Sequence, residues 1–394
     1  MNYDFDLAID RRGTLSYKWD SADDDVIPLW VADMDFATAP VIKKALADRV
    51  SHGIYGYTLV PDAYYQAVTG WFARRHGWHF PAEWMLYTSG VVPAISAIIK
   101  ALTKPGDEVV VQSPVFNCFF SSIRNNGCRA VTNELVYGNG TYRIDFADLE
   151  QKLSSPKAKI LLLCNPHNPT GRVWTRDELT RIGEICLRTD VWVVADEIHC
   201  EFVSPGHTYI PFGSLSAELM HKTIACLSPS KAFNLAGLQI ANIVCDDSDV
   251  RRSIDRAINV NEVCDVNPFG VTATMAAYTD EGADWLKALN GYIHANYLLL
   301  RDFFGRELPQ FPVTKLEGTY LVWVDCSATG KDSASIQHEL LTRHRVWVNE
   351  GEMYGPGGRD FIRINIACPQ QRLRQGLRRI ADGLQAMLPA GQGR

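Results

Sequence analysis

The stretch SPSKAFN, residues 228–234, holds one lysine among hydroxyl-bearing side chains and lies between two apolar runs. A lysine beside hydroxyls at the end of a buried strand can be desolvated and held in place. Such an amine is suited to forming a Schiff base with an aldehyde. A solvated lysine in an exposed turn is the alternative, and this stretch alone favours it. Lys231 is therefore a candidate that needs support from elsewhere in the chain.

Two more polar stretches follow strand-like apolar runs. Residues 165–171, NPHNPTG, come after the run 160–164, and Asp196 comes directly after the run 191–195. Paired Asn-Pro steps and a glycine favour a rigid turn, and open α/β sheets bind ligands at the carboxyl ends of their strands. We expect these groups to face one crevice. An aspartate in this position can instead cap a helix or a turn.

In this order, the Asn-Pro-x-Asn-Pro-Thr-Gly turn, the strand-end aspartate and the Ser-x-Ser-Lys lysine resemble the fold-type I pyridoxal-phosphate enzymes of the aminotransferase superfamily. The likeness covers nearly the whole chain and is strongest to the cystathionine β-lyase branch, which includes the maltose-regulon modulator type. The resemblance implies pyridoxal 5'-phosphate bound through Lys231. It also implies that Asp196 pairs with the ring nitrogen and that Asn168 donates to the ring oxygen.

A second set of residues is expected around the cofactor phosphate. Residues 88–93, TSGVVP, open an apolar helical pattern, and the free N–H groups and positive dipole end of a helix start favour an anion. A glycine before a helix is weak support by itself. With the resemblance, Gly90, Val91 and Val92 become the backbone that holds the phosphate.

The resemblance adds three side chains to this phosphate site. Ser228 and Ser230 belong to it in the same chain, and Tyr57 reaches it from the neighbouring subunit of a homodimer. Tyr55 lies in the same short aromatic window, IYGYT, and could be the packed aromatic of the two.

Substrate and ring contacts are also implied by the resemblance. Phe116 matches an aromatic that stacks on the ring, but many relatives carry tyrosine there, so a proton-shuttling hydroxyl is absent. Arg363 lies within the apolar strand pattern FIRINI, residues 361–366. The resemblance implies that it binds the substrate α-carboxylate. A structural ion pair with a carboxylate of the protein is the alternative. His199 and Gln239 stand where aspartate-type aminotransferases carry tyrosine and arginine, which favours the lyase branch. The resemblance also places His199 among the cofactor-binding residues.

The composition points to an ordinary globular chain of 394 residues, 46% hydrophobic, with a net charge of −6 and dispersed basic residues. This pattern argues against nucleic acid and membrane partners and favours a small-molecule substrate, which the resemblance implies to be an amino acid. The N-terminus lacks a signal-peptide pattern. The ten cysteines form no Cys-x-x-Cys pair, so we expect reduced core thiols in a cytoplasmic protein, without disulfides or a metal site.

The element pattern predicts an α/β fold. Strands at about 159–164, 191–195, 223–227 and 238–245 alternate with helices, as in a mostly parallel sheet between two helical layers. We expect an arm at 1–45 on the active-site side, a large cofactor-binding domain at 46–284 and a smaller α+β domain at 285–394. Within the arm, Trp30 and Phe36 could serve the substrate side or simply pack.

The predicted function is β-elimination from cystathionine or a related cysteine S-conjugate, yielding thiol, pyruvate and ammonia. The first alternative is an aminotransferase for an L-amino acid, because both reactions share the steps up to loss of the α-proton. The second is a regulatory protein that keeps the cofactor mainly for structure and binds a partner protein. The physiological substrate and any such partner are left open by the sequence.

Overall fold

The computed structural model describes residues 3–260 and 265–389. Its centre is a seven-stranded sheet with the order β2-β10-β9-β8-β7-β3-β4. The four predicted strands are all present, and the sheet is mostly parallel as expected. β10 alone runs antiparallel to both of its neighbours. The strands of this sheet are β2 (Met85–Thr88), β3 (Glu108–Ser113), β4 (Arg129–Glu134), β7 (Ala158–Cys164), β8 (Trp192–Asp196), β9 (Thr223–Leu227) and β10 (Ala241–Val244).

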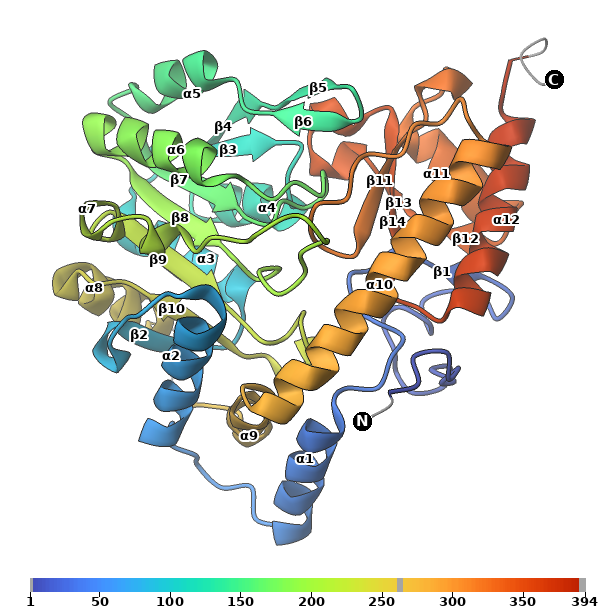
Figure 1. Ribbon diagram of the computed structural model, residues 1–394. Coiled ribbons are helices and arrows are strands. Elements are labelled where there is room, and N and C mark those ends of the chain that lie inside the picture. The colour runs from blue at the N-terminus through green and yellow to red at the C-terminus, as the bar shows by residue number, and fades with distance from the viewer. Residues whose placement is uncertain (1–2, 261–264, 390–394) are drawn as a thin grey trace.

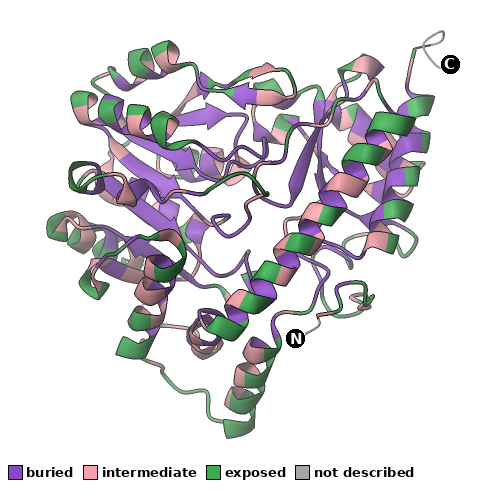
Figure 2. Cartoon of the chain, viewed as in Figure 1, coloured by how far each residue is buried: buried purple, intermediate pink, exposed green. Residues whose placement is uncertain are grey.

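Helices cover both faces of this sheet (Figure 1), which makes the predicted three layers. Each face buries its own apolar cluster, as Figure 2 shows by the purple strands between striped helices. One face carries α3 (Val91–Leu102), α4 (Asn117–Asn125) and α8 (Ser248–Asn259), and the other carries α5 (Phe146–Leu153) and α6 (Arg176–Thr189). α6 begins at a capping box, in which Thr175 and Glu178 bond each other's backbone N–H groups.

One predicted strand is shorter than its apolar pattern. The run 238–245 pairs only from Ala241, because residues 236–238 form a 3₁₀ turn and Gln239 takes a left-handed backbone conformation with φ 52°. Apolar character marks burial, and buried turns share it with strands. The remaining elements of this part are α1 (Pro40–His52), α2 (Asp62–His76), the β5–β6 hairpin (Val136–Gly138 and Thr141–Arg143), α7 (Ala217–Met220) and α9 (Pro268–Ala277).

The C-terminal third forms a second, antiparallel sheet of β11 (Leu321–Asp325), β14 (Phe361–Asn365) and β13 (Asn349–Glu350). It packs with α11 (Ser333–Thr342) and α12 (Gln370–Ala386). The long α10 (Asp280–Glu307) lies diagonally between the two parts in Figure 1 and starts five residues before the predicted boundary at 285. The division into an arm and two domains remains a prediction.

The N-terminal segment joins the second sheet region. Its short β1 (Ile27–Pro28) pairs in parallel with β12 (Val346–Trp347). Residues 30–36 then cross toward the ends of the central strands, where their backbone bonds side chains of β14 and of the turn that follows β9. The role of the arm as a whole remains a prediction.

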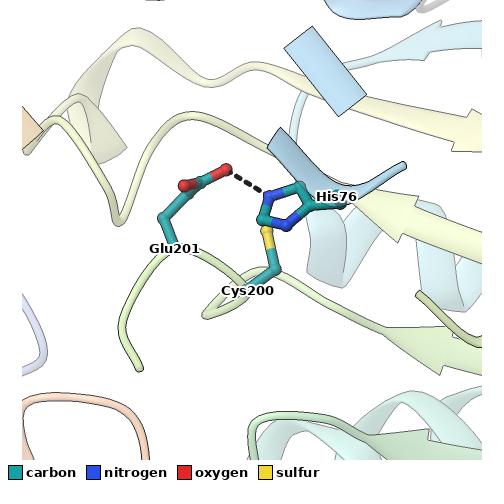
Figure 3. A group of neighbouring side chains, drawn as sticks. All are labelled: His76, Cys200 and Glu201. Atoms are coloured by element: carbon teal, nitrogen blue, oxygen red, sulfur yellow. Dashed lines mark hydrogen bonds and ion pairs between the residues drawn. The ribbon is translucent and has the colours of Figure 1, made fainter. Parts of the chain in front are cut away.

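The described cysteines are all free thiols, and seven of these nine are buried. His76, Cys200 and Glu201 lie close together (Figure 3) with a donor geometry that resembles a metal site. Both oxygens of Glu201 already accept hydrogen bonds, from Trp71, His76 and the cation of Arg75. The group is explained as a buried ion-pair cluster.

Among the residues that the structure describes, none of the helices combines the length and the apolar character needed to cross a bilayer.

Candidate active site

A cavity of about 220 Å³ lies at the carboxyl ends of β7, β8 and β9. The turns that follow these strands supply much of its wall, together with the start of α3 and one residue of the N-terminal segment. This is the position at which an open α/β sheet binds ligands. Its polar and charged lining residues are Ser89, Asn168, Asp196, His199, Ser230, Lys231 and Gln239, and its backbone and apolar lining includes Ala32, Gly90, Val91, Val92, Phe116 and Cys164.

Lys231 faces this cavity, as the candidate amine should. Its Nζ donates a hydrogen bond of 2.6 Å to the carbonyl of Ala32. Burial lowers the pKa of Lys231, the nearby Asp33 carboxylate opposes this shift, and the Arg363 cation adds to it. A lower pKa increases the share of neutral amine, which is the form that attacks an aldehyde and accepts a proton.

Asp196 ends β8 and is a buried member of the cavity lining. Its Oδ1 accepts the backbone N–H of Ile198 at 3.1 Å. Burial raises the pKa of Asp196 to about 6, although the Ile198 N–H and the Lys231 charge act in the other direction. Burial disfavours the ionised form of Asp196. A cationic ligand that enters the cavity therefore stabilises this carboxylate.

We expect Asp196→Asn to stabilise the cofactor-free protein at pH 7 by up to about 3 kcal/mol. Between about pH 4 and pH 6 the folded wild type holds a proton on Asp196 that the unfolded chain has lost, so its stability falls as the pH rises through this window. The amide side chain of the Asp196→Asn variant does not titrate, so the stability of the variant does not fall in this window. Its oxygen can still accept the Ile198 N–H. Urea unfolding of both proteins at pH 4 and pH 7 measures the difference, and an equal pH dependence would contradict the expectation.

The start of α3 forms another wall. Gly90 precedes the helix with φ 157°, and no side chain caps the N–H groups of the first turn. Val91 and Val92 line the cavity with these amides at the positive end of the helix dipole, so the predicted anion site is in reach of the cavity.

The two serines of the lysine turn differ in position. Ser230 lines the cavity, whereas Ser228 is not among the lining residues. The Ser228 hydroxyl donates to the Ile240 carbonyl at 2.6 Å and accepts the Ser230 backbone N–H at 3.1 Å. Ser228 thereby stabilises the turn, and its predicted contact with phosphate remains untested.

Arg363 is a buried cation held by two hydrogen bonds. Its Nη1 donates to Asn168 Oδ1 at 3.0 Å and its Nη2 donates to the Trp30 carbonyl at 2.9 Å, whereas its Nε has no partner among the residues that the structure describes. The Tyr354 ring lies 4.9 Å from the guanidinium. Within residues 3–260 and 265–389 no carboxylate forms a salt bridge with it, so the alternative of a structural ion pair is not supported.

This contact also orients Asn168. An arginine can only donate, so the amide oxygen must face Arg363. The amide nitrogen is then left as the donor for the cavity, which suits the predicted bond to a ring oxygen.

Phe116 and His199 both line the cavity, as predicted. His199 is buried, and this burial lowers its pKa well below the usual range, with the charges of Lys231 and Arg363 acting in the same direction. The imidazole therefore remains neutral and can meet a ligand as a flat, uncharged ring.

Tyr57 is outside the cavity of its own chain. Its side chain is 96% exposed, on a loop that also exposes Ile54, Tyr55 and Leu59. The contact of Tyr57 across a dimer therefore stays a prediction.

Ala32, Ser89 and Tyr320 were missed as site residues. Ala32 acts through its carbonyl, which no side-chain pattern could reveal, and Tyr320 donates to the same carbonyl at 3.0 Å. Ser89 lines the cavity beside Gly90. Its signal was a hydroxyl directly before the predicted anion-binding helix.

The donor set fits pyridoxal phosphate. The cavity offers an amine for the aldehyde in Lys231, a carboxylate for the ring nitrogen in Asp196, a phenyl face in Phe116 and free helix N–H groups for the phosphate. The unpaired Nε of Arg363 adds an unsatisfied donor beside Asn168. No metal chemistry is needed to explain this arrangement.

Comparison with known proteins agrees with this site. A sequence model of the family "Aminotransferase class I and II" matches residues 24–380. The chain is 42% identical to cystathionine β-lyase PatB of Bacillus subtilis, over 96% of this chain and 99% of that protein. The chain belongs to the aminotransferase class I and II family.

Two solved structures share the whole fold. Cystalysin from Treponema denticola, which contains pyridoxal 5'-phosphate, is 34% identical with a TM-score of 0.93, over 98% of this chain and 100% of its own. A pyridoxal-phosphate-bound protein from Clostridium difficile 630, provisionally assigned as an aminotransferase, is 39% identical with a TM-score of 0.95, over 97% and 100%. The predicted fold class is confirmed.

Proposed function

We propose that this protein is a pyridoxal-phosphate-dependent carbon–sulfur β-lyase that cleaves cystathionine or related cysteine S-conjugates. The observation that carries the proposal is the buried Arg363, which pairs with no carboxylate of the described part of the chain and bonds Asn168 in the lining of a cavity that also contains Lys231 and Asp196. An amino acid brings the missing carboxylate and an amine to the same place. The similarity to cystathionine β-lyase PatB supports the choice of the lyase within the family.

Pyridoxal phosphate, when bound, supplies an aldehyde and an electron-withdrawing ring that stabilises negative charge on the substrate α-carbon. Lys231 would hold it covalently, Asp196 would keep its ring nitrogen protonated, and Phe116 would cover one ring face. Gly90, Val91, Val92, Ser228 and Ser230 would bind its phosphate, and Asn168 Nδ2 would donate to its ring oxygen.

Arg363 would bind the substrate carboxylate through two N–H groups, which fixes the α-carbon relative to Lys231. Lys231 Nζ then accepts the α-proton. The bond from the β-carbon to sulfur breaks, sulfur leaves with the electron pair, and the thiolate takes up a proton. The three-carbon remainder reacts with one water and yields pyruvate and ammonia.

The test separates the lyase from the aminotransferase. The purified enzyme is incubated with cystathionine, and separately with S-methylcysteine, without a keto acid, and pyruvate is measured against enzyme concentration. We expect many equivalents of pyruvate per site, because a thiolate leaves faster than the carbanion is reprotonated elsewhere. One equivalent or less, with turnover only when a keto acid is added, would favour the aminotransferase. No reaction in either case would favour the regulatory protein.

We include a homodimer in the proposal. The loop at residues 53–60 exposes Ile54, Tyr55, Tyr57 and Leu59, and a second copy is the partner that would cover them. Tyr57 would then reach the phosphate of the neighbouring subunit.

Mixing Tyr57→Phe chains with Lys231→Ala chains tests this arrangement. A mixed dimer has one site with both wild-type residues, so we expect activity to reappear on mixing. An inactive mixture, together with a fully active wild-type monomer in sedimentation experiments, would contradict a shared site.

The remaining parts of the proposal concern the location of the protein in the cell and its binding partners. A cytoplasmic location is supported by the free thiols of the described cysteines. The substrate is a small amino acid, and we propose no nucleic acid or membrane partner. A regulatory protein partner remains the alternative named above.

A further inference from the structure

Residues 30–36, WVADMDF, form an active-site strap whose backbone contacts both sheets. The Trp30 carbonyl accepts from Arg363 at 2.9 Å, and the Ala32 carbonyl accepts from Lys231 at 2.6 Å and from Tyr320 at 3.0 Å. The side chains of Lys231 and Arg363 thus donate to carbonyls that are only two residues apart in the chain. The position of this strap sets the positions of these two side chains.

Asn234 joins the strap to the lysine turn. Its Oδ1 accepts the Met34 N–H at 3.0 Å, and its Nδ2 donates to the Met34 carbonyl at 2.9 Å and to the Phe36 carbonyl at 3.0 Å. Its own backbone has φ 56°, a left-handed conformation that asparagine tolerates better than most residues. Three hydrogen bonds from one side chain, three residues after Lys231, give this connection little freedom.

The strap is also held by contacts that do not involve Asn234. Asn365 Nδ2 donates to the Val31 and Asp33 carbonyls at 2.6 and 2.7 Å. The buried Asp35 carboxylate pairs with Arg11 at 2.8 Å and with Lys18 and Arg372 at 3.2 Å each. The strap is therefore anchored by these contacts even without Asn234, and Asn234 adds the three hydrogen bonds that join it to the lysine turn.

We propose that Asn234 is a positioning residue for proton transfer, which keeps the Ala32 carbonyl in register with Lys231 Nζ. The inference rests on the proposed function. A neutral amine has one lone pair, and its direction follows from rotation about the Cε–Nζ bond. Donation of one N–H to the Ala32 carbonyl restricts this rotation, so the lone pair can be held toward the substrate α-carbon. Asn234 fixes the distance between the turn and the strap that makes this bond possible.

Asn234→Gly tests the proposal, because glycine keeps the left-handed backbone and removes all three hydrogen bonds. We expect kcat for β-elimination to fall about tenfold or more, KM to stay near the wild-type value, and the kinetic isotope effect of an α-deuterated substrate to rise. The isotope effect rises because proton removal becomes slower than the other steps. Loss of stability alone would not change it.

The matched control is Asn133→Ala. Asn133 is also buried, and its Nδ2 also donates twice, to the Asp145 carbonyl and to Asp148, but it lies in β4 at the far edge of the seven-stranded sheet. We expect its kcat and isotope effect to equal those of the wild type, with only stability reduced.

A second readout needs neither cofactor nor activity. In the cofactor-free protein, labelling of Lys231 by an amine-reactive ester is followed by peptide mass spectrometry. We expect faster labelling in Asn234→Gly than in the wild type or Asn133→Ala, because the amine has lost its fixed acceptor. Equal labelling and an unchanged isotope effect would overturn the role of Asn234. If the protein is not a lyase, the elimination assay fails for the wild type as well, while the labelling result still decides the contact.

Discussion

Lys231→Ala is expected to remove the covalent link to pyridoxal phosphate and to lower turnover by about 10⁴-fold or more. The wild type should be yellow and should retain the cofactor on Lys231 after reduction with borohydride. The reason is that the cavity-facing amine is Lys231, and its Nζ is desolvated there. Absorbance spectra and peptide mapping after reduction measure the loss.

Lys222→Ala is the control for this change. Lys222 directly precedes β9, the strand that leads to the Lys231 turn, but it pairs with the exposed Asp190 instead of facing the cavity. Its loss should leave colour and turnover unchanged. A colourless wild type, or a Lys231→Ala protein still reducible onto a lysine, would disprove the assignment.

Arg363→Gln is expected to lower kcat/KM for an amino-acid substrate by about 30-fold or more, since losing one member of a buried charge pair costs about 2 kcal/mol or more. Most of this loss should be an increase in KM, because the carboxylate contact exists before proton transfer begins. Arg363→Lys should recover little, since a lysine cannot replace the planar fork that bonds Asn168 and Trp30 together.

A substrate pair makes this result specific. The wild type should strongly prefer a cysteine thioether to the matching amine that lacks the α-carboxylate, and Arg363→Gln should lose this preference. Arg359→Gln is the control, because Arg359 lies on the same part of the chain but is exposed. If the variant still discriminates against the amine, Arg363 does not bind the carboxylate.

Residues at strand ends were the part of the site that local sequence could predict. Asp196, Asn168 and Lys231 each follow a buried apolar run, and parallel strands bring the ends of such runs to one edge of a sheet. Gly90 and the start of α3 were predictable for a similar reason, since a helix start has free N–H groups wherever it lies.

Partners far apart in the chain were decided by the tertiary structure. The sequence suggested a carboxylate for Arg363, but the fold supplies Asn168 and the Trp30 carbonyl, 195 and 333 residues away. Ser228 and Ser230 have the same residue type and differ by two positions, yet only the conformation of the turn decides which of them faces the cavity.

By itself, the sequence determined the α/β architecture, the order of the central strands along the chain and the residue types of the site, because burial patterns and turn residues are local properties. The tertiary structure decided that backbone carbonyls of residues 30–33 accept hydrogen bonds from the side chains of Lys231, Arg363 and Asn365. Every residue has such a carbonyl, so no side-chain pattern marks the ones that a fold will use.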